Sequence, residues 1–196
     1  MSEVVSSAGT RERVVTATLE LFRRQGYNGT SLKDITRVSG ATTGSIYHFF
    51  PGGKDALTAE VLRESGHGYG EFVELIVRSA SDPVAGLADA FAGAAQLLVD
   101  TDFIDPCPIG AVAREVANTN DELRQIAAEV IADWQRRFVG ILVEVGAEES
   151  AARRLAALVV ASIEGGFVMA RASRSVEAFS AVGAEVVDAV ARAVEL

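Results

Sequence analysis

The chain has little cysteine and no long apolar run. Its one cysteine, Cys107, excludes an internal disulfide framework and fits a reducing, cytoplasmic compartment. Residues 1–13 lack an apolar run, so we expect no secretory signal. The most apolar stretch, Leu155 to Ala170, is short for a membrane span and contains Glu164. It therefore favours a buried helix, and we expect no membrane partner.

Enzyme signatures are also missing. The sequence contains no Gly-x-Ser-x-Gly, no Walker loop, no His-Glu-x-x-His and no paired cysteines, so we expect neither an enzyme nor a metal or cofactor. The glycines at 66, 68 and 70 are not a dinucleotide fingerprint, because no strand precedes them. They weaken their helix or let another backbone approach closely. With the proline-flanked loop at 106–108, we expect them to interrupt tight packing and leave room for a ligand. No segment alternates apolar and polar residues long enough to need a strand, which predicts an all-α fold.

Charge is unevenly distributed along the chain. The formal net charge is −9, yet residues 1–60 hold seven basic and six acidic side chains, a net charge of +1. The rest of the chain therefore carries −10. A nearly neutral, locally basic segment can still bind phosphates. The acidic remainder should keep non-specific affinity for DNA modest.

Residues 31–50 have the pattern of a helix-turn-helix. The first helix has a capping box, a glycine stop and apolar residues at helical spacing: Ser31, Asp34, Gly40, Leu32, Ile35 and Val38. Thr42 can cap the second helix. Its inward side holds Ile46, Phe49 and Phe50, and its outward side holds Thr43, Gly44, Ser45, Tyr47 and His48. A surface helix of small and hydrogen-bonding residues suits the major groove of DNA.

Caps and helix breakers predict the other helices. Residues 1–9 are expected to form a loose arm, and Thr10 to cap a first helix ending near Gln25. Thr119 and Glu122 have the spacing of a capping box. The expected helices span about 10–25, 54–79, 83–100, 108–116, 120–145, 148–171 and 175–195. We predict a DNA-binding domain at residues 1–53 and a helical body for ligand binding and dimerisation at residues 54–196.

The helix expected at 148–171 is apolar on two sides. One seam holds Leu155, Leu158, Ser162, Gly165 and Met169, and a second holds Ala156, Val160, Ile163, Phe167 and Ala170. One side can face the chain's own bundle, and the other needs a partner. With Val182, Val186 and Ala189 of the last helix, the first seam predicts a symmetric four-helix homodimer interface. A large monomeric bundle is the alternative.

With these motifs the chain resembles the TetR family of one-component regulators. The resemblance covers residues 10–57 and rests on Leu21-Phe22, Gly26-Tyr27, Thr30-Ser31, Asp34-Ile35, Gly44 to Pro51, Lys54 and Leu57. The segments Pro106 to Gly110 and Ile163 to Gly166 resemble the drug- and flavonoid-responsive branch near lincomycin-resistance regulators. The resemblance implies a three-helix DNA-binding head, a ligand-binding and dimerising body, and repression relieved by a small molecule.

The DNA-binding residues predicted on this basis are Ser31, Lys33, Thr42, Thr43, Gly44, Ser45, Tyr47, His48 and Lys54. Thr43 and Ser45 can read base edges, and Gly44 permits close approach of the backbone. Tyr47, His48 and Lys54 suit phosphate contacts. The expected partner is a near-palindromic, double-stranded operator. A constitutive DNA-binding protein, an enzyme and a helical adaptor are the competing classes, and specific DNA binding would separate a regulator from the last two.

The ligand-binding residues predicted are His67, Phe72, Phe91, Leu98, Phe103, Cys107, Trp134, Phe138, Glu164 and Met169. They favour a flat, largely apolar or aromatic effector. Most aromatic stripes are simply core, so we expect about half of the large apolar residues in this set to line the cavity. His67 is either a pocket donor or a surface residue, Cys107 a pocket or loop thiol without a resolving partner, and Glu164 either a ligand contact or the partner of an arginine.

Overall fold

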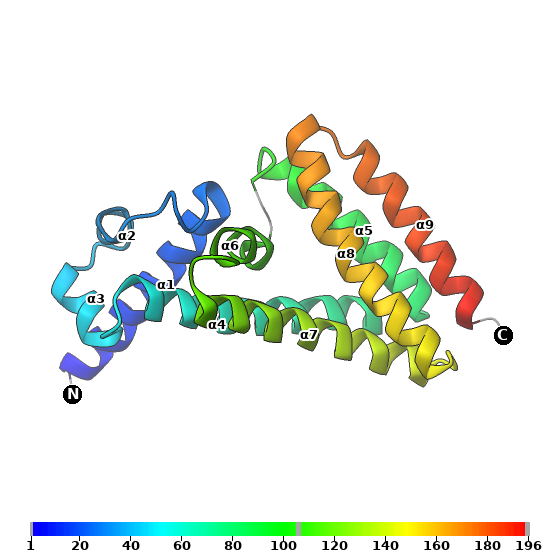
Figure 1. Cartoon of the computed structure of the whole chain (residues 1–196), viewed down its shortest axis with the longest axis horizontal. Helices are drawn as coiled ribbons and strands as arrows, with labels where there is room; N and C mark the ends of the chain where they lie inside the picture. Colours follow the sequence, from blue (N-terminus) through cyan, green and yellow to red (C-terminus); the bar gives the residue numbers. More distant parts are fainter. Residues whose placement is uncertain (1, 105–106, 195–196) are drawn as a thin grey trace. The chain divides into compact units, whose positions relative to one another are not determined.

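The computed structural model describes residues 2–104 and 107–194, and every regular element in these two ranges is an α-helix (Figure 1). The all-α prediction is therefore confirmed for the part of the chain that is described. The helices are α1 Ser2–Gln25, α2 Leu32–Ser39, α3 Thr43–Phe49, α4 Lys54–Ser79, α5 Pro83–Asp100, α6 Pro108–Val116, α7 Asp121–Glu144, α8 Glu149–Ser173 and α9 Glu177–Val194. Pro106, expected beside Cys107, lies outside the described residues.

Local capping chemistry sets several of these boundaries. The Ser31 hydroxyl accepts the Asp34 backbone N–H at 3.1 Å, and the Asp34 carboxylate accepts the Ser31 N–H at 3.1 Å, so the predicted capping box is confirmed. Gly40 ends α2 with φ of 67°, a left-handed conformation that glycine adopts without strain. Asp82 caps α5 by accepting the N–H groups of Val84 and Ala85 at 2.9 Å.

Three local expectations were wrong. Residues 2–9 continue α1 as helix, because the run has no proline and only one glycine to interrupt it; Thr10 lies inside α1, where its hydroxyl accepts from Arg13. Asn120, and not Thr119, caps α7, since its side chain accepts the Leu123 N–H at 3.1 Å. Val38 is exposed, and the small Ser39 takes the buried position at the end of α2.

Two compact units make up the chain, and the division falls inside α4 and α7. The first unit comprises Met1–Gly66 and Cys107–Val130, and the second comprises His67–Pro106 and Ile131–Leu196. In the first unit α1 packs on α2, α3 and α6 around a core of Phe22, Ile35, Ile46, Leu57 and Val112. The domain boundary at residue 53 remains a prediction, since compactness groups α6 and the start of α7 with the helix-turn-helix.

The second unit has a core of stacked rings set against glycines. Phe179 of α9 stacks on Phe167 of α8 with ring centroids 5.3 Å apart, and it meets Phe91 of α5 at 5.6 Å. A Cβ at Gly166 would lie 2.4 Å from the Phe179 ring, and one at Gly183 would lie 2.8 Å from the Phe91 ring. The glycines therefore let α5, α8 and α9 pack closely around these rings.

Candidate nucleic-acid interface and ligand cavity

The helix-turn-helix presents a polar face on α3. Ile46 and Phe50 are buried and Phe49 is half-buried, so the predicted inward side is confirmed. The outward residues Thr43, Gly44, Tyr47 and His48 are exposed, as are Ser31, Lys33 and Thr42 nearby, while Ser45 is half-exposed. All seven exposed positions and Ser45 are residues that the sequence analysis assigned to DNA. A short helix with hydroxyl, imidazole and bare backbone on one side can present donors and acceptors to base edges and phosphates.

The start of α3 is fixed by hydrogen bonds within the turn. The Thr42 hydroxyl accepts the Ser45 N–H at 3.1 Å and lies 2.9 Å from the Ser45 hydroxyl. Thr42 therefore caps α3 as predicted. The Ser45 hydroxyl therefore takes part in the cap of α3. The exposed Thr43 hydroxyl, also at the start of α3, does not take part in it.

Lys54 is held against the connection between α1 and α2. Its ammonium donates to the Tyr27 carbonyl at 2.6 Å and lies 3.8 Å from the centroid of the Tyr27 ring. Partial burial lowers the pKa of this ammonium. The side chain thus ties the first turn of α4 to the loop that precedes α2.

A polar cluster around Tyr27 was missed by the sequence analysis. The Tyr27 hydroxyl donates to Asp55 at 2.5 Å, and Asn120 donates to the same carboxylate at 2.9 Å. Burial and the Asp55 carboxylate raise the pKa of Tyr27 to about 12. The Glu115 carboxylate of α6 accepts the Asn28 N–H at 2.6 Å. These contacts join residues 28 to 87 positions apart, which helical periodicity cannot indicate.

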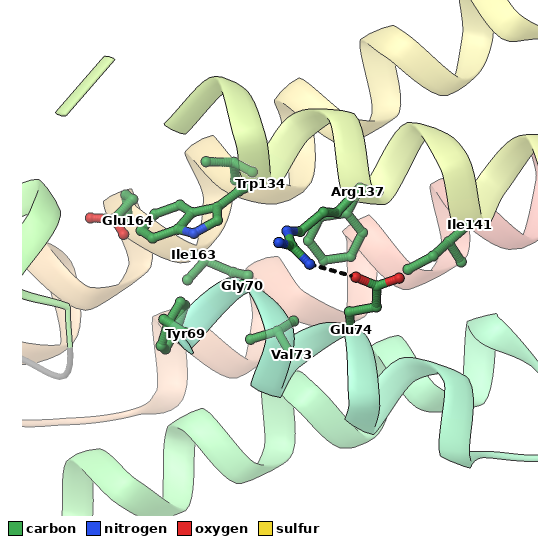
Figure 2. A pocket seen from close by; sticks show the side chains of 11 residues that line it. Tyr69, Gly70, Val73, Glu74, Trp134, Arg137, Ile141, Ile163 and Glu164 are labelled. Carbon is green, nitrogen blue, oxygen red and sulfur yellow. Dashed lines mark hydrogen bonds and ion pairs between the residues drawn. The ribbon is translucent and has the colours of Figure 1, made fainter. Parts of the chain in front are cut away.

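A cavity lies within the second unit, between α4, α7 and α8 (Figure 2). Trp134 and Phe138 reach it from α7, and Glu164 from α8, as the sequence analysis expected. The other lining residues are Tyr69, Gly70, Val73, Glu74, Arg137, Ile141, Val160 and Ile163. Val160 and Ile163 belong to the second seam of α8, so helical periodicity carried a signal for them. Tyr69 and Trp134 face each other with ring centroids 5.4 Å apart.

The glycines of α4 close this region instead of leaving room in it. A Cβ at Gly70 would lie 2.8 Å from the Trp134 ring, and one at Gly66 would lie 2.4 Å from Val130. Gly68, on another side of α4, faces open space. Gly66 and Gly70 therefore receive α7 side chains directly against the α4 backbone, which corrects the expectation that they interrupt packing. The volume of the cavity that the centre of a water molecule can occupy is about 20 Å³. This is room for about one water.

The other seven predicted ligand residues lie outside this cavity. Phe91 and Leu98 are buried in the core of the second unit, and Cys107 is buried in the first unit. Phe72 and Met169 are 59% and 41% exposed. The remaining two are in polar surroundings: His67 contacts Glu71 and Arg137, and Phe103 lies under the guanidinium of Arg174. Which helix face points inward depends on the neighbouring helices, and residue type alone does not reveal it.

The two seams of α8 have opposite environments. Ala156, Val160, Ile163, Phe167 and Ala170 are all buried. On the first seam Leu158, Gly165 and Met169 are exposed, and Leu155 and Ser162 are half-exposed. Of the α9 residues predicted at an interface, Val182 and Ala189 are half-exposed, while Val186 belongs to the core.

The length and composition of α8 would let it cross a membrane, a test that core helices of soluble proteins also pass. The apolar stretch from Leu155 to Ala170 is shorter than this 25-residue helix, and the expectation of no membrane partner stays a prediction. The helix is also not fully buried, because only 33% of its most apolar 18-residue window is buried within the protein. We name the exposed and half-exposed seam of Leu155, Leu158, Ser162, Gly165 and Met169 the outer seam.

Two family models match the chain in its two functional regions. The model for bacterial regulatory proteins of the tetR family matches residues 14–61, which include the whole helix-turn-helix. The model for the C-terminal domain of LmrA/YxaF-like transcriptional regulators matches residues 83–185, which include α5 to α8. Together they cover the α3 surface and the α7 and α8 walls of the cavity.

Curated relatives and solved structures agree with this match over nearly the full length. The chain is 32% identical to the uncharacterized regulator YxaF of Bacillus subtilis over 85% of this chain and 87% of YxaF. It is 30% identical to the regulator LmrA of the same species over 87% of this chain and 91% of LmrA. A TetR transcriptional regulator from Chloroflexus aurantiacus superposes with a TM-score of 0.80 at 25% identity, covering 95% and 96% of the two chains.

Proposed function

This chain belongs to the TetR family of DNA-binding transcriptional regulators, and on that premise we propose that it is a repressor released from its operator by a small, largely apolar ligand. The observation that carries the ligand part is the cavity, in which aromatic rings from α4 and α7 meet aliphatic side chains from α8. The lining of this site, apolar with a few polar groups, has the chemistry that suits an aromatic molecule.

The DNA-bound form in this proposal is a homodimer on a near-palindromic operator. Each chain has a single helix-turn-helix, so two copies are needed to read two half-sites. The outer seam of α8, with Val182 and Ala189 of α9, supports a helix-to-helix interface between the copies. Half-sites are expected one helical turn apart or a multiple of it, about 34 Å per turn. A cytoplasmic location is part of this proposal, because a DNA-binding regulator acts where its operator is.

Release requires the cavity to enlarge. At about 20 Å³ for the centre of a water molecule, it holds about one water in this conformation, far less than an aromatic molecule needs. The ligand therefore selects a form in which α4, α7 and α8 lie further apart. Because α4 carries Tyr69 and Glu74 in the cavity and Lys54 at its first turn, it is the element we expect to transmit the change. DNA binding weakens if that form holds the two heads at a different spacing.

The test begins with an operator selected from randomised duplexes. Aromatic drug-like compounds and flavonoids are then titrated while operator affinity and the emission of Trp134, the single tryptophan, are followed together. We expect compounds that alter the emission to weaken operator binding. Compounds that bind in the body and leave operator affinity unchanged would favour a constitutive DNA-binding protein, the second candidate function.

A pair of glycine variants provides the matched control. Gly70→Ala places a Cβ 2.8 Å from Trp134, so it should shift the ring and change ligand affinity. Gly68→Ala adds the same methyl group to the same helix where nothing lies within 4 Å, so ligand affinity should stay at the wild-type level. Equal behaviour of the two variants would move the ligand site away from Trp134.

A further inference from the structure

We propose that a groove between α7 and α8 binds organic anions, that is, molecules that carry a carboxylate on an apolar body. The site is separate from the cavity between α4, α7 and α8, and the inference does not rest on the proposed function. Four residues of α7 and one of α8 line the groove: Ala132, Gln135, Arg136, Val139 and Arg153. None of these residues lines the cavity or belongs to the outer seam.

The size of the groove is the first observation. The volume that the centre of a water molecule can occupy is about 460 Å³ in the groove and about 20 Å³ in the cavity. Sites for small molecules typically measure about 300–1,000 Å³. The groove can therefore take a small molecule without movement of the helices. A lining of five side chains is small for a protein partner, which needs about 20–30 residues on each side.

The lining of the groove carries positive charge. Its two charged residues are arginines, and none of its five described residues has a carboxylate. The cavity has the opposite balance, with the carboxylates of Glu74 and Glu164 and the guanidinium of Arg137. Residues 61–196 as a whole carry a net charge of −10. The groove is thus a local exception within an acidic body, and its charge attracts an anion.

Both guanidinium groups are held only weakly. The side chains of Arg136 and Arg153 are each 67% exposed, and each pairs with a carboxylate of its own helix, Asp133 and Glu149. Asp133 also accepts from Arg137, so this carboxylate is shared between two guanidinium groups. Exposed ion pairs within one helix contribute little free energy. A guanidinium held in this way can turn towards a ligand carboxylate and form charge-assisted hydrogen bonds with it.

The rest of the lining suits the apolar body of such a ligand. Ala132 and Val139 are half-exposed, so an apolar ring that covers them removes their surface from water. Gln135, also half-exposed, has an amide that can donate and accept hydrogen bonds. An inorganic anion would leave Ala132 and Val139 in water. The groove therefore favours an anion with an apolar body.

Three probes test this inference. Naphthalene-2-carboxylate at pH 7 is the organic anion, naphthalene-2-carboxamide is its neutral counterpart with nearly the same shape, and sulfate is an anion without an apolar body. Binding of the two naphthalene probes to the full-length protein is measured by NMR titration, and sulfate is added as a competitor. We expect the carboxylate to bind about tenfold more tightly than the carboxamide. Sulfate at the same concentration should leave most of the carboxylate bound.

Three variants locate the site. Arg136→Met and Arg153→Met each remove one guanidinium from the lining, so each should weaken carboxylate binding by about twofold to fivefold. Binding of the carboxamide should stay at the wild-type level. Arg154→Met is the matched control, because it removes the same charge from an exposed position of α8 outside the groove. This control should bind the carboxylate as the wild type does. All three side chains are exposed, and circular dichroism checks that the variants fold.

Other outcomes overturn the inference. An equal loss in all three variants would assign binding to general charge. A loss in Arg136→Met alone would assign it to the cavity, because Asp133 links Arg136 to Arg137 in the cavity wall. Equal affinity for the two naphthalene probes, complete displacement by sulfate, or no binding of either probe would exclude an organic anion as the ligand. A groove variant with an altered sedimentation coefficient would assign the groove to an interface between two copies of the chain.

Discussion

α3 and α8 each have one face that the rest of the chain leaves exposed, and these two faces differ in polarity. The outward face of α3 is polar, with Thr43, Tyr47 and His48 exposed around Gly44. The outer seam of α8 is apolar, with Leu158 and Met169 43% and 41% exposed beside Gly165. Both faces lie opposite a buried side of the same helix, so neither is needed for packing within the chain.

The difference indicates different partners. A polar face costs little in water, so only the chemistry of its side chains points to a partner, and hydroxyls on a short helix fit base edges. An apolar face exposed to water is unfavourable by itself, and covering it with another apolar face stabilises the assembly. A second copy of the same seam is the simplest cover, because a two-fold axis brings identical surfaces together.

The largest effect is expected at Gly165. Gly165→Arg adds a charged side chain to the outer seam, where a Cβ meets nothing within 4 Å in the monomer. The monomer should fold normally, and the buried charge should separate the dimer. Loss of two-site binding should weaken operator binding by roughly 100-fold or more. Sedimentation velocity, circular dichroism and operator titration measure the three quantities.

The neighbouring glycine gives the opposite expectation. Gly166→Ala directs a Cβ to 2.4 Å from the Phe179 ring, so it should lower the free energy of unfolding by about 1–3 kcal/mol through overpacking. The proposed dimer interface should remain intact in this variant. A Gly165→Arg protein that sediments as a wild-type dimer would place the interface elsewhere and remove one half of the comparison.

The next effect concerns base reading on α3. Thr43→Ala removes an exposed hydroxyl and methyl group from the start of the helix, so preference at one base pair should fall by about 1–3 kcal/mol. Affinity for operators already altered at that base pair should change little. Tyr47→Phe, which removes only a hydroxyl from an exposed ring, is the control and should weaken all operators alike. A Thr43→Ala protein with unchanged preference at every position would contradict base reading by this residue.

A substitution of Lys54 can distinguish a direct contact between its ammonium and a DNA phosphate from an indirect effect through its bond to the Tyr27 carbonyl. Lys54→Met should weaken binding to all operators, with the salt dependence shallower by about one unit, if the ammonium contacts a phosphate. Lys33→Met removes an exposed ammonium from α2 in the same way, and the salt dependence of its operator binding is compared with that of Lys54→Met. A lower melting temperature with an unchanged salt slope would mean that Lys54 acts only through its bond to the Tyr27 carbonyl.

The sequence was sufficient for elements governed by local chemistry. The bounds of α4, α5 and α6 agree with the approximate spans predicted, because Lys54 follows a Pro-Gly-Gly break and Asp82-Pro83 and Pro108 are helix-start signals. The two seams of α8 were also separable, since burial follows the 3.6-residue period. On α3 the same period separated the outward residues from Ile46 and Phe50.

Contacts between distant segments were not accessible in this way. Phe72 and Tyr69 are both aromatic residues of α4, yet Tyr69 lines the cavity and Phe72 is exposed. Three residues turn the helix by about 300°, so Phe72 lies about 60° around the helix from Tyr69, beyond the edge of the cavity. The packing of Trp134 onto Gly70 decides which side faces inward. The bonds of Tyr27 to Asp55 and of Glu115 to Asn28 depend on the same tertiary placement.

The smallest effect is expected from the two helix caps beside the polar face. Ser31→Ala removes the hydroxyl that caps α2, which should cost about 1 kcal/mol of unfolding free energy at pH 7. Hydrogen bonds from Ser31, with a further one from Arg37, lower the pKa of Asp34 from 3.8 to about 2. Thr42→Ala removes the matching cap of α3, where the third residue of the capped segment is Ser45 and carries no charge.

The pH dependence of the two losses should therefore differ. A carboxylate whose pKa is lower in the folded state stabilises the fold above its unfolded pKa, near 4, and this contribution disappears as the pH falls towards about 2. Because Ser31 is the main cause of that lowering, the deficit of Ser31→Ala should be largest at pH 7 and should shrink below about pH 4. The deficit of Thr42→Ala should stay constant. Urea unfolding between pH 7 and pH 3 measures both, and a constant deficit for Ser31→Ala would mean that Asp34 is not coupled to the cap.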